Sequence, residues 1–235
     1  MTIWDRVERA AGGARPTLTY ERIALAGVAL ADAEGLGAVS MRKVAARLGS
    51  GTMSLYRYVE SRDDLIALMV DAIMAEAVVP SPTGDWRADL TGYARISRRV
   101  TLRHPWLADY ATSMSGFGPN GLAMAESTLA LLDGYGLTGA QMFDLWATVQ
   151  AFVQGYVLEE VARRAMQQRS GSERLSWRFD PPPQLHRALA TGRYPLLSRL
   201  VADAALPPDA DATFERHLGY VLDGVAGIIE GRDRG

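Results

Sequence analysis

Hydrophobic and polar residues alternate at helical spacing in a short stretch near residue 40. Apolar side chains occupy positions i, i+3, i+4 and i+7, at Met41, Val44, Ala45 and Leu48. This spacing predicts one apolar stripe on a helix of about two turns. Ser40 precedes the stripe, and serine is a favourable N-cap because its side chain accepts a hydrogen bond from an N–H of the first turn.

A second short helix is expected after Gly49, because glycine readily adopts the left-handed backbone conformation that ends a helix. We place it over residues 52–59, with Leu55 and Val59 facing inward. Isolated helices of fewer than about 12 residues are marginal in water, so both short helices need a supporting platform.

Two longer helices flank this pair. The first is expected to run from Thr19, a favourable N-cap, to about Glu34. The other begins at Ser61, where Asp64 completes an acidic capping box, and ends before Pro80. Three helices with the third presented outward, followed by a connecting helix, predict a helix-turn-helix DNA-binding head over residues 18–79.

Long segments with helical periodicity make up the rest of the chain after residue 84. None of them alternates with the two-residue period of a strand. We therefore expect an all-α protein in which residues 84–235 form a larger helical domain and residues 1–17 an N-terminal arm. The expected helical segments of the larger domain are 86–103, 106–114, 120–135, 140–168, 184–205 and 212–230.

Composition argues against several classes of function. The chain of 235 residues is 48% apolar but has no cysteine, so no disulfide, thiolate metal site or cysteine nucleophile is available. No close pairing of histidine with carboxylates and no phosphate-binding glycine loop nominates a catalytic group, so we do not expect an enzyme. Neither a signal-peptide pattern nor a membrane-spanning run is present, which predicts a cytoplasmic protein.

Positive charge is concentrated in the two short helices. Residues 40–60 contain Arg42, Lys43, Arg47 and Arg57 against the single anion Glu60, a net charge of +3. The whole chain carries −2, so the remaining residues sum to −5. This distribution suits a head that meets DNA phosphates and a body that does not.

The head resembles the tetracycline-repressor (TetR) family of bacterial transcriptional regulators. The resemblance is carried by Leu18-Thr19, Glu34-Gly35, SMRKVAARLG at 40–49, LYRYV at 55–59 and Leu65. It departs from the family at Ser50-Gly51, where a small apolar residue and then Ser or Ala is usual, and at Arg62, where Lys is preferred. The resemblance implies a ligand-responsive repressor that binds a palindromic operator as a homodimer and is released by a small, largely apolar or aromatic effector.

The resemblance also assigns DNA contacts to the two short helices. Bases are expected to meet Thr52, Met53 and Ser54, and Arg42 can reach a guanine edge. Phosphates are expected to meet Ser40, Lys43, Tyr56, Arg57, Tyr58 and Arg62. The alternative for the two tyrosines is packing on the small core of the head, and for the arginines a solvated surface.

A ligand pocket inside the second domain is a further implication of the family. Such pockets are mostly apolar and carry a few placed polar groups. The candidate ligand contacts are Tyr93, Ser97, His104, Trp106, Tyr110, Met114, Phe117, Met142, Trp146, Gln150, Phe152 and Trp177. The alternative for the aromatic and methionine residues is ordinary core packing.

His104 has a second interpretation as a metal ligand. It precedes Pro105, near the position where tetracycline-binding relatives place a metal-coordinating histidine, and Glu159 and Glu160 could add carboxylates. Three scattered histidines do not form a ligand cluster, and a histidine beside a helix break is more often a cap or a surface group. We therefore expect no metal site and no cofactor.

The last helical segment carries an apolar stripe interleaved with three glycines, which suggest close helix approach. Together with residues 140–168 it could form a four-helix bundle with a second subunit, as the family does. The expected interface residues are Phe214, Leu218, Val221, Leu222, Val225 and Ile228. The alternative is that this stripe packs into its own domain.

Two segments keep open interpretations. Residues 1–17 form either a disordered leader or an arm whose Arg6, Arg9 or Arg15 contacts DNA. Residues 169–183 form either a gate over the pocket, with Leu175 and Trp177 folding inward, or a plain connector. The alternative to a ligand-responsive regulator, associated with the nucleoid when DNA-bound, is a DNA-binding or scaffold protein that senses no ligand.

Overall fold

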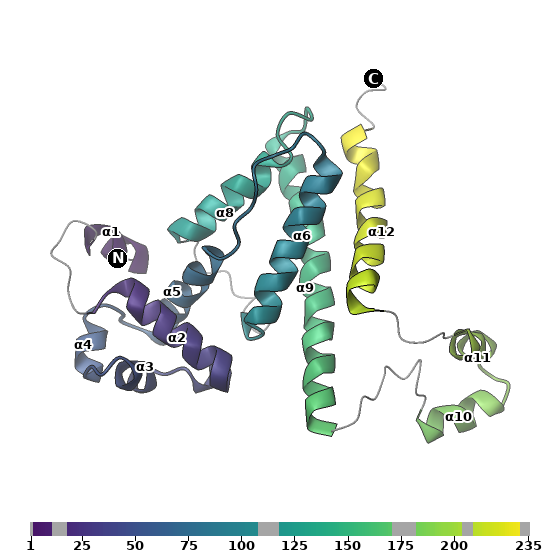
Figure 1. Ribbon diagram of the computed structural model, residues 1–235, viewed down its shortest axis with the longest axis horizontal. Helices are drawn as coiled ribbons and strands as arrows, with labels where there is room; N and C mark the ends of the chain where they lie inside the picture. The colour runs from purple at the N-terminus through teal and green to yellow at the C-terminus, as the bar shows by residue number, and fades with distance from the viewer. Residues whose placement is uncertain (1, 11–17, 108–117, 171–181, 204–208, 231–235) are drawn as a thin grey trace.

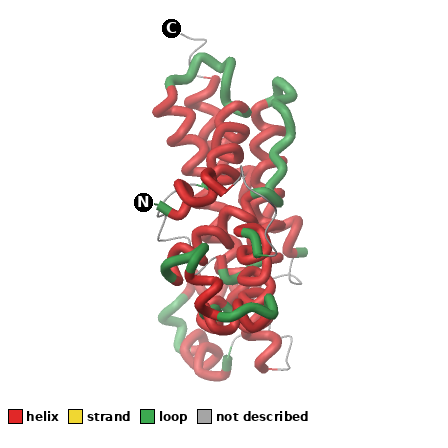
Figure 2. The backbone as a smooth tube through the Cα atoms, turned by 90° about the vertical axis from the view of Figure 1, so that its left-hand side faces the viewer, coloured by secondary structure: helices red, strands yellow, loops and turns green. Residues whose placement is uncertain are grey.

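The computed structural model describes residues 2–10, 18–107, 118–170, 182–203 and 209–230, and for 166–170 the backbone alone. Every regular element in these ranges is a helix, so the all-α prediction is confirmed (Figures 1 and 2). The elements are α1 (Ile3–Ala10), α2 (Tyr20–Glu34), η1 (Leu36–Ala38), α3 (Met41–Arg47), α4 (Thr52–Tyr56), α5 (Arg62–Met74), α6 (Trp86–Arg103), α8 (Pro119–Ala130), α9 (Gly139–Ser170), α10 (Pro183–Ala190), α11 (Pro195–Ala202) and α12 (Ala210–Glu230).

Local capping explains where the helices of the head begin. Thr19, Ser40 and Ser61 are extended residues whose side-chain oxygens accept hydrogen bonds from backbone N–H groups three residues later, at 3.1, 3.3 and 3.0 Å. Gly49 has φ +63°, which confirms the left-handed turn between α3 and α4. α4 is shorter than expected and ends at Tyr56.

The head packs around a small core between α2, α3, α4 and α5. Ile23, Val44, Leu55 and Leu65 have no exposed surface. α2 and α5 cross closely, because a Cβ added at Gly27 would lie only 2.6 Å from the Met69 sulfur. These contacts form the platform that the two short helices need.

The N-terminal segment folds against the head. Ile3 is 5% exposed and belongs to the head core, so residues 3–10 are not a disordered leader. Arg6 forms ion pairs with Glu60 and Asp64, the latter at 2.7 Å. Arg6 therefore binds carboxylates at the start of α5. Arg15 lies outside the described residues.

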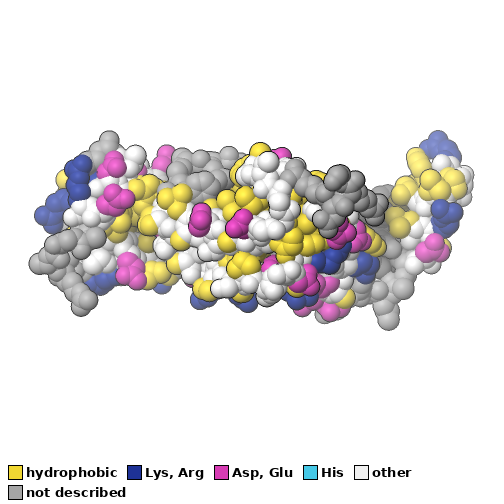
Figure 3. Space-filling view, turned by 90° about the horizontal axis from the view of Figure 1, so that it is seen from above, with side chains coloured by type: hydrophobic (Ala, Val, Ile, Leu, Met, Phe, Trp, Pro, Cys, Tyr) yellow, Lys and Arg dark blue, Asp and Glu magenta, His cyan; other side chains and the backbone are white. Residues whose placement is uncertain are grey.

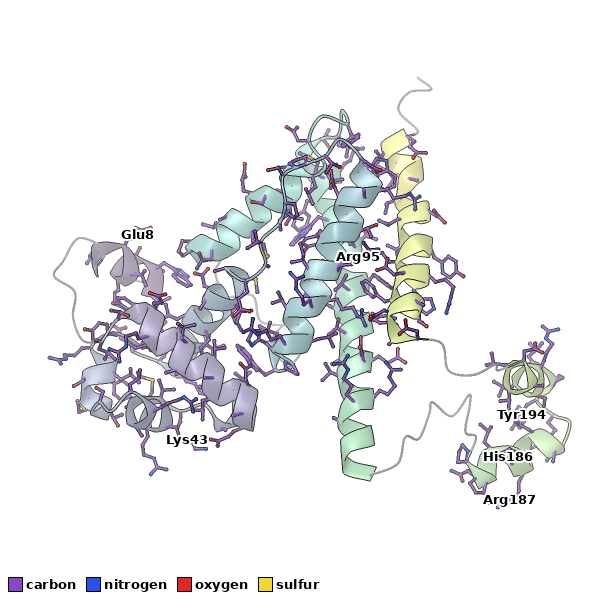
Figure 4. The ribbon with its side chains drawn as sticks, in the orientation of Figure 1. Glu8, Lys43, Arg95, His186, Arg187 and Tyr194 are labelled. Atoms are coloured by element: carbon purple, nitrogen blue, oxygen red, sulfur yellow. The ribbon has the colours of Figure 1, made fainter. Side chains whose placement is uncertain are left out.

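α6, α9 and α12 form the centre of the body, and α8 packs against both α5 and α9 (Figure 1). Ion pairs add to the apolar packing: Arg95 of α6 reaches Glu215 of α12 at 2.7 Å, as its direction in Figure 4 shows. Arg98 binds the buried Glu160 of α9 at 3.0 Å. The expected segment 86–103 is confirmed by the bounds of α6.

The expected helix over residues 184–205 is two helices instead of one. α10 ends before Gly192, which has φ +72°, and Pro195 starts α11. No residue of either helix is buried. Both lie apart from the rest of the body. Figure 4 labels His186 and Arg187 on α10 and Tyr194 just before α11.

Candidate DNA interface and effector site

α3 and α4 present a group of exposed side chains on one end of the head. Met53 is 78% exposed and Tyr56 43% exposed, and Arg42 and Arg57 are also exposed. Among the described residues, neither arginine has a hydrogen bond or an ion pair. Figure 3 shows cationic side chains at the outer end of the head, which lies on the left. An arginine without a partner in its own chain is free to bind a phosphate or a base edge.

Two of the expected phosphate contacts, Arg62 and Tyr58, have partners within the head. Arg62 donates from Nη2 to the carbonyl of Leu36 at 2.8 Å and from Nε to that of Val39 at 3.1 Å, so it holds the turn between α2 and α3. Tyr58 packs edge-on against Tyr20, with ring centroids 5.3 Å apart, and contacts the head core. For Tyr58 the structure therefore favours the alternative of core packing.

Lys43 and Ser40 also take part in the fold of the head. Lys43 forms an ion pair with Glu34 at 2.7 Å, with both side chains substantially exposed. Such surface pairs contribute about 0–1 kcal/mol, so a DNA phosphate can displace Glu34 at little cost. Ser40 uses its hydroxyl as the N-cap of α3. Thr52 and Ser54, expected at the bases, are half-buried at the start of α4.

Four of the expected ligand contacts form one polar cluster between α6 and α9. Tyr93 donates to Gln150 Oε1 at 2.6 Å, and Trp146 Nε1 donates to the Tyr93 hydroxyl at 2.9 Å. Ser97 donates to the same Gln150 oxygen at 3.3 Å. Burial raises the pKa of Tyr93 to about 12, so its hydroxyl stays protonated and can act as a donor even well above neutral pH.

Two more of the expected ligand contacts, Phe152 and Met142, belong to the core of the body. Phe152 stacks on Phe214 with ring centroids 5.6 Å apart, which makes it part of the body core, and Met142 packs against the same core. Tyr110, Met114, Phe117 and Trp177 lie outside the described residues.

His104 and Trp106 lie at the junction between head and body, so the structure places them away from the polar cluster of α6 and α9. His104 Nδ1 lies 2.8 Å from Asp32 Oδ1 of α2, and its Nε2 lies 3.3 Å from Glu76 Oε2, just after α5. Trp106 Nε1 donates to the same Asp32 oxygen at 2.8 Å. The His104 side chain is 3% exposed. We call Asp32, Glu76, His104 and Trp106 the junction cluster.

The metal interpretation of His104 is not supported by these contacts. The ring faces Asp32 and Glu76, whereas Glu160 is held by Arg98 at 3.0 Å and by Arg164 at 2.6 Å. No group of three or more histidine, aspartate or glutamate side chains in the described ranges could hold a metal ion.

A second contact between the connecting helix and the body is made by Asp71. Its carboxylate accepts hydrogen bonds from Gly121 N at 2.9 Å and from Asn120 Nδ2 at 3.0 Å, at the N-terminus of α8. A carboxylate at a helix N-terminus satisfies free N–H groups and complements the helix dipole. Burial raises the Asp71 pKa above its usual value. α5 is thus tied to the body at Asp71, and the residues just after it at Glu76.

The sequence and the fold match known regulators over almost their whole length. The model for "Tetracyclin repressor-like, C-terminal domain" matches residues 80–229, and the model for "Bacterial regulatory proteins, tetR family" matches residues 23–69. The chain belongs to the tetracycline-repressor family.

Individual TetR-family relatives are similar in sequence and structure. The transcriptional repressor DrrR1 of Streptomyces coeruleorubidus is 36% identical, over 98% of this chain and 85% of that protein. Apo ActR of Streptomyces coelicolor superposes with a TM-score of 0.74 at 31% identity, covering 93% of this chain and 100% of ActR. ActR in complex with actinorhodin superposes with a TM-score of 0.74 at 32% identity, covering 92% of this chain and 99% of ActR.

Most of the expected dimer-interface residues of this TetR-family chain lie in its own core. Phe214, Leu218, Leu222 and Val225 of α12 are at most 5% exposed and pack against α6 and α9 of the same chain. For these four the structure favours the alternative of packing into the domain. Val221 is half-buried and Ile228 is 46% exposed.

The glycines of α12 do not mark a close approach within this chain, because a Cβ at Gly219, Gly224 or Gly227 would contact nothing within 4 Å.

Sequence reasoning missed Asp32, Asp71 and Glu76. Only Asp71 gave a local indication, as a carboxylate within the apolar run of α5. No helix in the described ranges combines the length and hydropathy needed to cross a membrane.

Proposed function

We propose that this TetR-family protein is a repressor that binds a palindromic operator as a homodimer and releases it when a small aromatic effector binds. The observation that carries the proposal is the exposed group on α3 and α4. Arg42 and Arg57 have no partner within the described chain, and Met53 projects into solvent. A large exposed apolar side chain beside cations that have no partner in the head suits a surface that DNA covers.

The exposed group divides into base readers and phosphate contacts. Arg42 and Met53 point away from the head core and can enter the major groove, where Arg reads guanine and apolar groups contact the thymine methyl. Tyr56 and Arg57 at the end of α4 bind phosphates, which position the head without reading sequence. On a chromosomal operator the protein is associated with the nucleoid.

The polar cluster of α6 and α9 is the proposed effector site. Tyr93, Ser97, Trp146 and Gln150 combine aromatic surfaces with hydrogen-bonding groups, which suits a flat molecule with polar substituents. ActR, which is 32% identical, binds actinorhodin. This likeness supports an aromatic effector of the same general kind.

Apolar groups left exposed on α9 and α12 are the proposed dimer interface. Phe143 is 54% exposed, Tyr220 66% and Ile228 46%. Gly224 and Gly227 of α12 are exposed and leave room for a close helix from a second subunit. Two heads held about one helical turn apart would read the two halves of a palindrome.

Coupling between effector and operator runs through α5. Its N-terminal end belongs to the head, whereas Asp71 binds α8 and Glu76 contacts His104 after α6. A shift of α6 or α8 around a bound effector therefore moves α5 and changes the spacing of the two heads. By linkage, operator DNA must weaken effector binding by the same factor that effector weakens operator binding.

The test begins with footprinting of the DNA beside the protein's own gene, followed by fluorescence anisotropy on the protected duplex. Arg42→Ala should weaken binding by about 1–3 kcal/mol and relax the preference at one base pair. Arg187→Ala, which removes an exposed arginine from α10, is the matched control and should bind normally. Normal operator binding by Arg42→Ala would refute the assignment of the DNA face.

A further inference from the structure

The junction between head and body contains a cleft that the proposed function does not use. Its volume is about 380 Å³, within the range of small-molecule sites, which often occur between domains. One wall belongs to the head and the other to the body. The residues that matter here are Ala31, Asp32 and Gly35 at the end of α2, Trp106 after α6, and Leu158 and Ala162 on α9.

We propose that this cleft binds a small organic cation with an apolar body, such as an arylalkylamine, as a second ligand site. Among the described residues that line the cleft, Asp32 alone is charged, and the others contribute apolar side chains or backbone. The apolar lining favours a hydrophobic body, and the carboxylate selects a cation over a neutral or anionic molecule of the same shape.

The carboxylate of Asp32 has capacity for such a ligand. Its Oδ1 faces His104 and accepts a hydrogen bond from Trp106, while no described residue hydrogen-bonds to Oδ2. The side chain is 33% exposed, so a ligand can reach it from the cleft. Trp106 also lines the cleft and can provide an aromatic face for the cation.

This cleft is separate from the polar cluster of α6 and α9. None of Tyr93, Ser97, Trp146 or Gln150 lines it. Because Ala31 and Asp32 move with the head whereas Leu158 and Ala162 move with the body, the cleft changes shape when the head tilts. A ligand held there favours one head orientation, and it adds a second input to operator affinity. Binding itself does not depend on the proposed repressor activity.

The experiment is isothermal titration calorimetry on the full-length protein without DNA. The probes are tryptamine and tryptophol, which share an indole and a two-carbon chain but end in an ammonium and a hydroxyl. A charge-assisted hydrogen bond to Asp32 should make tryptamine bind about tenfold more tightly than tryptophol. Equal affinity for the two probes, or no binding of tryptamine at millimolar concentration, would overturn the proposal.

Variants locate the bound probe. Ala162→Phe fills the cleft from an exposed position on α9 and should abolish tryptamine binding, whereas Ala123→Phe makes the same change on the exposed face of α8 and should not. Asp32→Asn keeps an acceptor for Trp106 but should remove the preference for the cation. If Ala162→Phe binds tryptamine normally, or if Gln150→Ala abolishes binding, the probe occupies another site and the proposal fails.

Discussion

Replacing His104 by alanine tests how strongly the junction cluster joins head and body. The change removes the contacts with Asp32 at 2.8 Å and with Glu76 at 3.3 Å. Hydrogen bonds to charged groups contribute about 1.5–3 kcal/mol each, and the longer contact belongs at the lower end. Because the His104 side chain is only 3% exposed, lost packing adds to this. We expect a total loss of about 4 kcal/mol in the free energy of unfolding.

Two conservative variants divide this loss between the partners. Asparagine places a donor near the position of Nδ1 and should keep part of the Asp32 contact, whereas glutamine extends towards Glu76. Since the Asp32 contact is shorter, we expect stability to fall in the order wild type, His104→Asn, His104→Gln, His104→Ala. For a chain of this size about 1 kcal/mol corresponds to roughly 2–4 °C, so the alanine variant should unfold about 8–16 °C lower.

The measurement is differential scanning calorimetry at one fixed protein concentration, because the unfolding temperature of the proposed dimer would depend on concentration. His186→Ala is the matched control, since His186 is exposed on α10 away from the body (Figure 4). If His104→Ala and His186→Ala unfolded at the same temperature, the junction cluster would not stabilise the protein.

Two further predictions concern the turn of the head and the connecting helix. Gly49→Ala should destabilise the protein by about 1–2 kcal/mol in urea titrations, because φ is +63° and an added Cβ meets nothing within 4 Å, which leaves backbone strain as the only cost. Gly35→Ala is a comparison that should cost more, because φ +83° with ψ 160° is a backbone conformation that essentially only glycine adopts. An unchanged midpoint for both variants would contradict the strain argument. For Asp71, burial raises the folded-state pKa above the ordinary value of 3.8, so the stability it contributes is present below that pH and is lost as the pH rises through the folded pKa. As the pH rises through this interval, wild type should lose stability whereas Asp71→Asn should not. The unfolding free energy of the variant should therefore rise relative to that of wild type, and a difference that does not vary with pH would refute this reasoning.

The sequence was sufficient for the features that depend on near neighbours along the chain. Thr19, Ser40 and Ser61 cap helices because each cap joins residues only three positions apart, and the turn at Gly49 needs only its own backbone freedom. Helical periodicity likewise predicted α6 with its observed bounds. These short-range patterns depend little on distant segments, which is why the helix-turn-helix could be recognised.

Tertiary packing decided which surfaces those helices keep. The stripe on α12 has the spacing of an interface, yet Phe214 and Leu218 face α6 and α9 of the same chain, because periodicity shows that a face is buried but not what covers it. His104 looked like a pocket residue or a metal ligand until the fold placed Asp32 and Glu76 on either side of its ring. These partners are far from His104 in sequence, so no local pattern could bring them together. The sequence alone determined the helix starts of the head and its DNA-binding motif, whereas only the packing of distant segments decided how the head is attached to the body.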